Sequence, residues 1–209
     1  MSQPTSIIVL GAGGRMGSII ARLAQESPLF KLVAVVERPD REASIASWDC
    51  IHGTNVKDVL PQAPGAVIID FTSPDATMAV ARVNVAYGNP HVIGTTGLTE
   101  GQKLELANLA QKAPMFWSPN MSVGINVLLR VLPELVRLLG DQYDLEMVEL
   151  HHKHKKDAPS GTALRLAECL AEAKGWKLRD VGRYEREGII GERAHEEIGV
   201  QTIRGGDDL

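Results

Sequence analysis

The 209-residue sequence has few cysteines, no long hydrophobic run and no excess of positive charge, and each absence excludes a class of protein. Its two cysteines, Cys50 and Cys169, show neither a CxxC motif nor metal-ligand spacing, which predicts reduced thiols. The first residues, Met-Ser-Gln-Pro-Thr-Ser, contain no basic region followed by an apolar one, so no secretory signal is predicted. We therefore expect a cytoplasmic protein.

The most apolar helical stretch, residues 127–139, is interrupted by charged residues and a proline, and it is too short to span a bilayer. The formal net charge of −4 gives no general attraction to nucleic acid or anionic lipid. The remaining composition is that of an ordinary soluble protein, 44% hydrophobic and 23% charged. We expect no membrane segment and no nucleic-acid partner.

Short β-branched runs alternate with helical patterns in the first half of the chain. Strands are predicted at residues 7–10, 32–36, 66–70, 91–94 and 115–117. Helices are predicted from the glycine-rich turn to about residue 25, at about 75–86 and at about 99–112. Continuous apolar strands separated by helices predict a parallel sheet covered on both faces, an α/β fold of the Rossmann type.

The pattern changes after Asn120. A long helix is predicted at about 122–139, followed by an alternating strand at 144–151, which we expect to belong to a sheet with one polar face. A helix at about 160–173 and strand-like segments near 184–190 and 198–204 complete the chain. We expect a Rossmann domain at residues 1–122 and an α+β domain at residues 123–209.

A glycine-rich turn directly follows the first predicted strand and opens a predicted helix. Glycines there permit a tight turn and let backbone N–H groups approach a pyrophosphate, whose charge is favoured by the helix N-terminus. The spacing is GxxGxxG with one additional glycine, rather than the strict GxGxxG. The loop predicted to bind a dinucleotide comprises Gly11, Gly13, Gly14, Arg15, Met16 and Gly17.

Glu37 and Arg38 follow the second predicted strand and bear on the choice of cofactor. A carboxylate about twenty residues after the glycine turn can accept hydrogen bonds from the adenosine ribose, which favours NAD. The adjacent guanidinium can pair with the 2′-phosphate of NADP or stack on adenine. We therefore expect either NADH or NADPH to bind; the alternative is an ordinary turn with a surface ion pair.

Two further loops follow the next strands, where ligands of open α/β sheets bind. The first begins with Phe71 and Thr72. The second contains Gly94, Thr95 and Thr96, whose backbone groups and hydroxyls suit a nicotinamide ribose or carboxamide. Each would be a plain turn in isolation, but their repeated position at strand ends favours a cofactor site.

Residues 149–162 hold three of the six histidines and three lysines. A solvated basic turn would need no function, a nucleic-acid patch would need aromatic residues and a wider basic surface, and lysines would repel a metal ion. We favour an anion-binding catalytic site, because histidine suits proton delivery near neutral pH. Ser160 is a candidate N-cap that would leave the N–H groups of Gly161 and Thr162 for a carboxylate.

The segment 151–163, His-His-Lys-His-Lys-Lys-Asp-Ala-Pro-Ser-Gly-Thr-Ala, resembles the signature of the 4-hydroxy-tetrahydrodipicolinate reductase (dihydrodipicolinate reductase) family of lysine and diaminopimelate biosynthesis. Further motifs match this family in the same order. They are the glycine turn, Asp-Phe-Thr at 70–72, Gly-Thr-Thr-Gly at 94–97 and Pro-Asn-Met-Ser-Val-Gly-Ile-Asn at 119–126. The resemblance covers essentially the whole chain.

The resemblance implies hydride transfer from NADH or NADPH to a small cyclic dicarboxylate, followed by protonation of the adjacent carbon. It implies that His151 is the proton donor and that Lys155 assists it. The expected substrate-binding residues are His152, Ser160, Gly161, Thr162 and Arg204. The residues expected to close over the nicotinamide are Ser118, Pro119, Asn120 and Met121. No metal is expected.

The family resemblance also implies a cytoplasmic homotetramer assembled through the sheet of the second domain. Family members normally continue beyond the end of this sequence, so we expect a C-terminally truncated second domain and a tetramer only if that region is complete. The alternatives are an inactive dinucleotide-binding or subunit-interaction remnant of the same fold, and a different small-substrate reductase such as an amino-acid dehydrogenase.

Overall fold

The computed structural model describes residues 3–207 and divides into two compact units, Met1–Pro119 and Asn120–Leu209. The expected domain boundary after residue 122 lies just inside the second unit. Among the described residues, no helix has the length and apolar character needed to cross a membrane. Cys50 lies in the first unit and Cys169 in the second, and both are free thiols.

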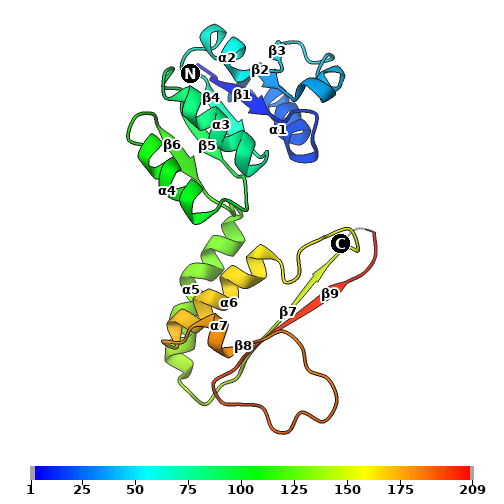
Figure 1. Cartoon of the computed structure of the whole chain (residues 1–209), viewed down its shortest axis with the longest axis vertical. Coiled ribbons are helices and arrows are strands. Elements are labelled where there is room, and N and C mark those ends of the chain that lie inside the picture. Colours follow the sequence, from blue (N-terminus) through cyan, green and yellow to red (C-terminus); the bar gives the residue numbers. More distant parts are fainter. Residues whose placement is uncertain (1–2, 208–209) are drawn as a thin grey trace. The chain divides into compact units, whose positions relative to one another are not determined.

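The first unit is built on one parallel sheet (Figure 1). Its strands are β1 (Thr5–Leu10), β2 (Phe30–Val36), β3 (Ile51–Gly53), β4 (Val67–Asp70), β5 (His91–Ile93) and β6 (Met115–Trp117). They lie in the order β3-β2-β1-β4-β5-β6, and every pairing is parallel. The strand order reverses between β1 and β4, which is where folds of this type bind dinucleotides.

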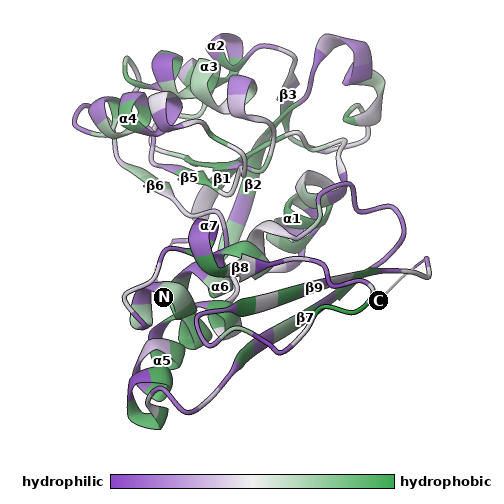
Figure 2. Ribbon diagram, turned by 60° about the horizontal axis from the view of Figure 1, so that its bottom comes forward, coloured by the Kyte–Doolittle hydropathy of each residue, from purple (hydrophilic) through white to green (hydrophobic). Residues whose placement is uncertain are grey.

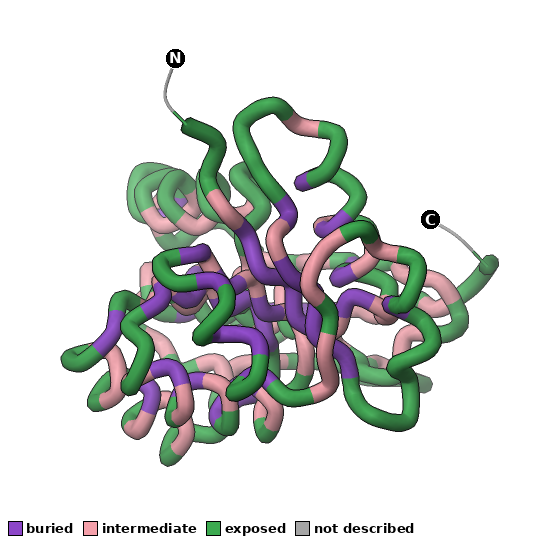
Figure 3. Tube along the Cα trace, turned by 90° about the horizontal axis from the view of Figure 1, so that it is seen from above, coloured by how far each residue is buried: buried purple, intermediate pink, exposed green. Residues whose placement is uncertain are grey.

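Helices cover both faces of this sheet. They are α1 (Arg15–Glu26), α2 (Val56–Val59), α3 (Pro74–Asn84) and α4 (Glu100–Leu109), with short 3₁₀ turns η1 (Pro39–Ser44) and η2 (Leu60–Gln62). Along β1, Ile8 and Leu10 join one buried cluster, whereas Ile7 and Val9 join another. The buried stretches therefore follow the strands (Figure 3). The predicted parallel sheet with two covered faces is confirmed.

The second unit combines helices with a smaller parallel sheet. Its elements are α5 (Val123–Leu139), β7 (Leu145–His151), α6 (Gly161–Ala173), α7 (Leu178–Val181), β8 (Gly182–Arg183) and β9 (Ile198–Arg204). The strand order is β7-β9-β8. Alanines 163, 167 and 171 of α6 pack on Ile198 and Val200 of β9 and form the core of this unit. Helix α5, in which hydrophobic residues predominate (Figure 2), packs along α6.

Two expectations for the second unit are wrong. The segment near 184–190 is not a strand: in this part of the described chain the pairing with β9 is confined to Gly182 and Arg183. Gly188 and Gly191 turn this segment with φ of 73°, and Arg186 binds Glu146 on β7, so ion pairs hold the segment instead of a strand ladder. The outer face of β7 is also not uniformly polar, because Val148 and Leu150 are exposed there.

Candidate active site

The glycine turn between β1 and α1 has little room for any other residue. Gly11 adopts a φ of +65° and donates its N–H to the carbonyl of Val36 at 2.8 Å. A Cβ on Gly17 would lie 2.1 Å from the carbonyl oxygen of Gly11, so the first turn of α1 packs directly on the loop backbone. Within the described part of the chain no side chain caps α1, whose first N–H groups therefore face a site suited to phosphate.

Glu37, directly after β2, fixes the glycine turn through its carboxylate. One oxygen of its buried carboxylate accepts the N–H of Gly13 at 3.0 Å, and the other accepts the N–H of Arg38 at 2.9 Å. Arg41 donates to the carbonyl of Gly13 at 2.8 Å. A Cβ on Gly13 would overlap the hydroxyl of Ser44. The carboxylate predicted to bind the ribose thus also shapes the loop predicted to bind the pyrophosphate.

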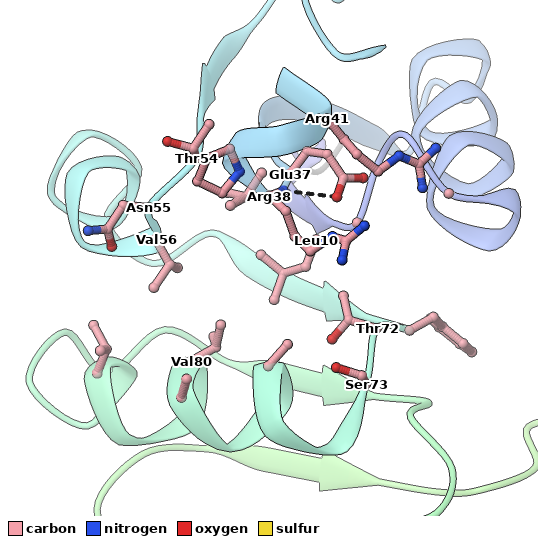
Figure 4. A pocket seen from close by; sticks show the side chains of 18 of the residues that line it. Leu10, Glu37, Arg38, Arg41, Thr54, Asn55, Val56, Thr72, Ser73 and Val80 are labelled. Atoms are coloured by element: carbon pink, nitrogen blue, oxygen red, sulfur yellow. Dashed lines mark hydrogen bonds between the residues drawn. The ribbon is translucent and has the colours of Figure 1, made fainter. Parts of the chain in front are cut away.

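A cavity of about 700 Å³ opens beside this turn (Figure 4). Its size falls in the range of small-molecule and cofactor sites. Glu37, Arg38 and Arg41 lie on one side, and Thr72 and Ser73 lie across from them at the start of α3. The remaining lining residues are Leu10, Gly11, Gly14, Val36, Pro39, Thr54, Asn55, Val56, Lys57, Phe71, Ala76, Ala79, Val80 and Val83. An apolar floor with charged groups at the rim suits the adenosine half of a dinucleotide.

A buried carboxylate joins the ends of β4 and β5. Asp70 is fully buried, and its Oδ1 accepts from the N–H and the hydroxyl of Thr72, at 3.0 and 2.6 Å. Its Oδ2 lies 3.3 Å from Nε2 of His91, which is equally buried. Burial favours a higher pKa of Asp70, but the hydrogen bonds from His91 and Thr72 outweigh it and lower that pKa. Asp70 therefore fixes the loop after β4 as a carboxylate.

The loop after β5 is fixed by the same network. Thr95 is buried, and its hydroxyl lies 2.8 Å from that of Thr77 and 3.3 Å from Oδ1 of Asp70. Its carbonyl accepts the indole N–H of Trp117 at 3.0 Å. The side chain of Thr95 thus faces inward, and the exposed Thr96 presents the free surface of this loop. The adjoining Gly94 leaves room for the ring of Phe71, which a Cβ would overlap.

The other predicted cofactor contacts are divided between the two units. Arg15 and Met16 are exposed at the start of α1. Ser118 donates its N–H to the carbonyl of Ile93 at 3.0 Å, which places the chain after β6 beside the end of β5. In the second unit, Asn120 donates to the hydroxyl of Thr162 at 3.1 Å.

The histidine-lysine segment lies between β7 and α6. His151 is the last residue of β7, and its Nδ1 is hydrogen-bonded to the carboxylate of Glu149. Ser160 caps α6 by accepting the N–H of Ala163 at 3.1 Å, so α6 begins at Gly161 as predicted. His151 and the start of α6 are thus brought together through Glu149, which also accepts the N–H of Ser160 at 3.0 Å.

Two of the three lysines of the segment, Lys153 and Lys155, have carboxylate partners. Lys155 pairs with Asp157 at 2.8 Å and lowers the pKa of that carboxyl. Lys153 pairs with Asp207, and His152 accepts the N–H of His154 at 3.2 Å. Lys153 and His154 are exposed, whereas His152 and Lys155 are half-buried. The described residues contain no group of three or more His, Cys, Asp or Glu side chains placed to hold a metal ion.

Arg204, at the end of β9, donates through Nη1 and Nη2 to Glu149, at 2.9 and 2.8 Å. Nη2 also donates to the carbonyl of Asp157 at 2.6 Å. The guanidinium predicted to bind substrate is therefore engaged with Glu149. Arg204 and then His151 lower the pKa of Glu149 to about 2, so this carboxylate stays charged at neutral pH.

Sequence reasoning missed Glu149 as a functional residue. The usable signal was its position two residues before His151 in an alternating strand, which places both side chains on one face. Its partners Thr202 and Arg204 lie more than fifty residues further along the chain, and their register against β7 emerges only in the sheet.

Comparison with known proteins identifies the family. The N-terminal region of dihydrodipicolinate reductase matches residues 5–121, and its C-terminal region matches residues 124–208. The chain belongs to the dihydrodipicolinate reductase family. It is 66% identical over 203 residues to the 4-hydroxy-tetrahydrodipicolinate reductase of Nitratidesulfovibrio vulgaris (strain Miyazaki F), covering 97% of this chain and 78% of that relative. The corresponding reductase of Anaeromyxobacter dehalogenans (strain 2CP-C) is 46% identical with the same coverage of both chains.

A solved structure agrees with the fold of this family member. The dipicolinate-bound dihydrodipicolinate reductase from Paenisporosarcina sp. TG-14 aligns with a TM-score of 0.70 at 23% identity, over 97% of this chain and 79% of that one. Like other members of its family, the chain is an oxidoreductase that uses a nicotinamide dinucleotide.

Proposed function

We propose that this family member reduces the cyclic dicarboxylate formed by dehydration of 4-hydroxy-tetrahydrodipicolinate, yielding tetrahydrodipicolinate for lysine and diaminopimelate biosynthesis. The named relatives and the matched family regions support this substrate. The reaction consumes one NADH or NADPH and one proton per substrate, and it releases the oxidised cofactor. The observation that carries the assignment to this chain is the joining of His151 and the N-terminus of α6 through one carboxylate.

The first unit would hold the cofactor. When bound, the nicotinamide supplies the hydride. The uncapped N-terminus of α1 would bind the pyrophosphate, and the cavity beside Glu37 and Arg38 would take the adenosine. The loops that end β4 and β5 lie next along the same sheet edge, where the other half of a dinucleotide crosses this fold. The tight packing of Gly17 on Gly11 supports this assignment, because it brings the first turn of α1 directly against the backbone of the glycine turn.

The second unit would hold the substrate and supply the proton. The N–H groups of Gly161 and Thr162 at the N-terminus of α6 would bind substrate carboxylates. The imidazole ring of His152 would bind them as well. His151 would protonate the carbon next to the one that receives the hydride, and Lys155 would assist by stabilising negative charge. We also propose that Ser118, Pro119, Asn120 and Met121 close over the nicotinamide.

Turnover tests the proposal directly. The full chain, given NADH and freshly formed cyclic dicarboxylate, should oxidise NADH at a rate that depends on the concentrations of both compounds. The loss of NADH absorbance measures this rate. A monocarboxylate amino-acid analogue should give little oxidation, because it lacks the second carboxylate. Cofactor binding by fluorescence without turnover would instead support a non-catalytic dinucleotide-binding protein.

We propose that Glu37 and Arg38 determine the preference between NADH and NADPH. Arg38 is solvent-exposed and pairs with the equally exposed Asp40 at 3.3 Å, a weak surface contact that a 2′-phosphate can replace. Replacing Arg38 with alanine should therefore raise the KM for NADPH by about tenfold or more, the value of a hydrogen bond to a charged group, and change that for NADH little. Arg22→Ala, on the exposed side of α1, is the matched control. Equal changes for both cofactors would contradict this role of Arg38.

A cytoplasmic homotetramer assembled through the second unit's sheet is also proposed. The exposed apolar residues Val148 and Leu150 of β7 and Ile203 of β9 lie on the outer face of that sheet and support it. Sedimentation equilibrium of the full chain should give four copies per particle. Replacing Leu150 with lysine should lower that number, whereas a particle of one copy in the unmodified protein would contradict the proposal.

A further inference from the structure

Glu149 makes more contacts than any role in holding β7 to β9 requires. The side chain is 8% exposed and lies on the face of β7 that His151 shares. Oε1 accepts from the N–H of Ser160 at 3.0 Å, the hydroxyl of Thr202 at 3.1 Å and Nη2 of Arg204 at 2.8 Å. Oε2 accepts from Nη1 of Arg204 at 2.9 Å and is hydrogen-bonded to Nδ1 of His151. One carboxylate thus joins a strand end, a helix start and the neighbouring strand.

The charge of Glu149 determines which protons its partners can carry. Arg204 in a two-point pair, followed by His151, keeps the pKa of Glu149 at about 2, so the side chain is an ionised carboxylate at neutral pH. An ionised carboxylate only accepts hydrogen bonds. Nδ1 of His151 must therefore carry the hydrogen in the contact with Oε2, and in the neutral ring Nε2 is then the bare nitrogen.

We propose that Glu149 is a positioning residue that sets the tautomer and orientation of His151 and holds it against the N-terminus of α6. Nε2, the nitrogen left free, is then the one that binds and delivers the proton to substrate. Because Ser160 binds the same carboxylate, the proton donor and the carboxylate-binding helix start move as one unit. This inference rests on the proposed role of His151, but the tautomer is independent of turnover.

The alternative is that Glu149 serves only as a buried partner for Arg204. That pair alone would stabilise the sheet and leave the ring of His151 free to adopt either tautomer. The two possibilities differ in the nitrogen spectrum of His151, which a purely structural role would not change.

The primary measurement is the ¹⁵N NMR spectrum of the histidine side chains in the full chain, with His151 assigned by the loss of its signals in His151→Gln. In the neutral ring, Nδ1 should carry the hydrogen and Nε2 should be bare. A wild-type ring protonated on Nε2 would overturn the proposal, whether or not any variant folds and whether or not the protein turns over.

The second measurement uses Glu149→Gln. A glutamine amide can donate as well as accept, so it no longer forces hydrogen onto Nδ1, and the ring should become a mixture of tautomers. We expect kcat to fall about 10–100-fold, as when carboxylates that orient metal-bound histidines are removed, with the affinity for NADH unchanged. Glu149→Asp, which keeps the charge but shortens the reach, should give an intermediate loss.

Glu146→Gln is the matched control. Glu146 lies on the same strand and is likewise paired with arginines, Arg186 and Arg193, but in the described structure it makes no hydrogen bond or ion pair with His151. This variant should keep the wild-type tautomer and kcat. Equal kcat and identical ring spectra for Glu149→Gln and Glu146→Gln would overturn the proposal. Absence of turnover in the wild type together with the Nδ1–H tautomer would instead count against the proposed function alone.

Discussion

Replacing His151 with glutamine should lower kcat about 10²–10⁴-fold while NADH binds as before. Glutamine has a similar length and can still donate a hydrogen bond to Glu149, but it cannot deliver a proton to carbon. The loops proposed to bind the cofactor lie in the other compact unit, so we expect their geometry not to depend on this side chain. The measurement is steady-state turnover with NADH and the cyclic dicarboxylate, alongside NADH affinity by fluorescence titration.

His154→Gln is the control for this experiment. His154 lies three residues further along the same loop, is largely exposed and contacts Asp207 at 3.5 Å. Removing its ring should change kcat little, because an exposed contact of this kind contributes little. If His151→Gln weakened NADH binding as much as it lowered kcat, His151 would be supporting the fold rather than donating a proton.

The strands of the first unit could be predicted because they are fully buried. A run such as Ile7 to Leu10 is apolar on both faces, and the glycine turn after it has a distinctive spacing. The segment at 184–190 misled the prediction because Tyr184, Ile189 and Ile190 favour strands, although the chain leaves the sheet after Arg183 and turns at Gly188 and Gly191 with positive φ. Local composition does not reveal that Arg186 finds its partner on β7.

The site residues that lie close together in the sequence could be predicted, whereas those brought together from distant parts of the sequence could not. His151, Lys155 and Ser160 lie in one continuous segment, so a motif could indicate them. Glu149 became visible only once β9 brought Arg204 and Thr202 beside it. Thr95 was expected to offer its hydroxyl to a ligand, but the hydroxyl lies within hydrogen-bonding distance of Thr77, which no spacing rule connects to it.

Each unit has a buried carboxylate near the end of a parallel strand. Asp70 ends β4 and Glu149 lies near the end of β7, and each is a buried carboxylate that fixes a following loop or helix through several donors. A buried carboxylate that loses its charge leaves its donors without an adequate acceptor. The stability of each unit should therefore depend on these carboxylates remaining ionised.

Replacing Asp70 with asparagine should lower the free energy of unfolding of the first unit by about 1.5–3 kcal/mol, the range for hydrogen bonds to a charged group. The amide puts an N–H where Asp70 now accepts from Thr72 or contacts His91. The loops after β4 and β5 should loosen together, so NADH should also bind more weakly. Urea unfolding followed by circular dichroism measures the first effect, and fluorescence titration measures the second.

The pH dependence of Asp70→Asn gives an independent check with a definite sign. Because folding lowers the pKa of Asp70 below its ordinary 3.8, its ionised form contributes stability that is present above that value and lost as the pH falls through the lowered one. The wild-type free energy of unfolding should therefore fall more steeply with acid than that of the variant. Asp75→Asn, which removes an exposed carboxylate from the first turn of α3, should cost no more than about 1 kcal/mol and should keep the wild-type acid slope. If both variants lost equal stability, Asp70 would not be the residue that holds these loops.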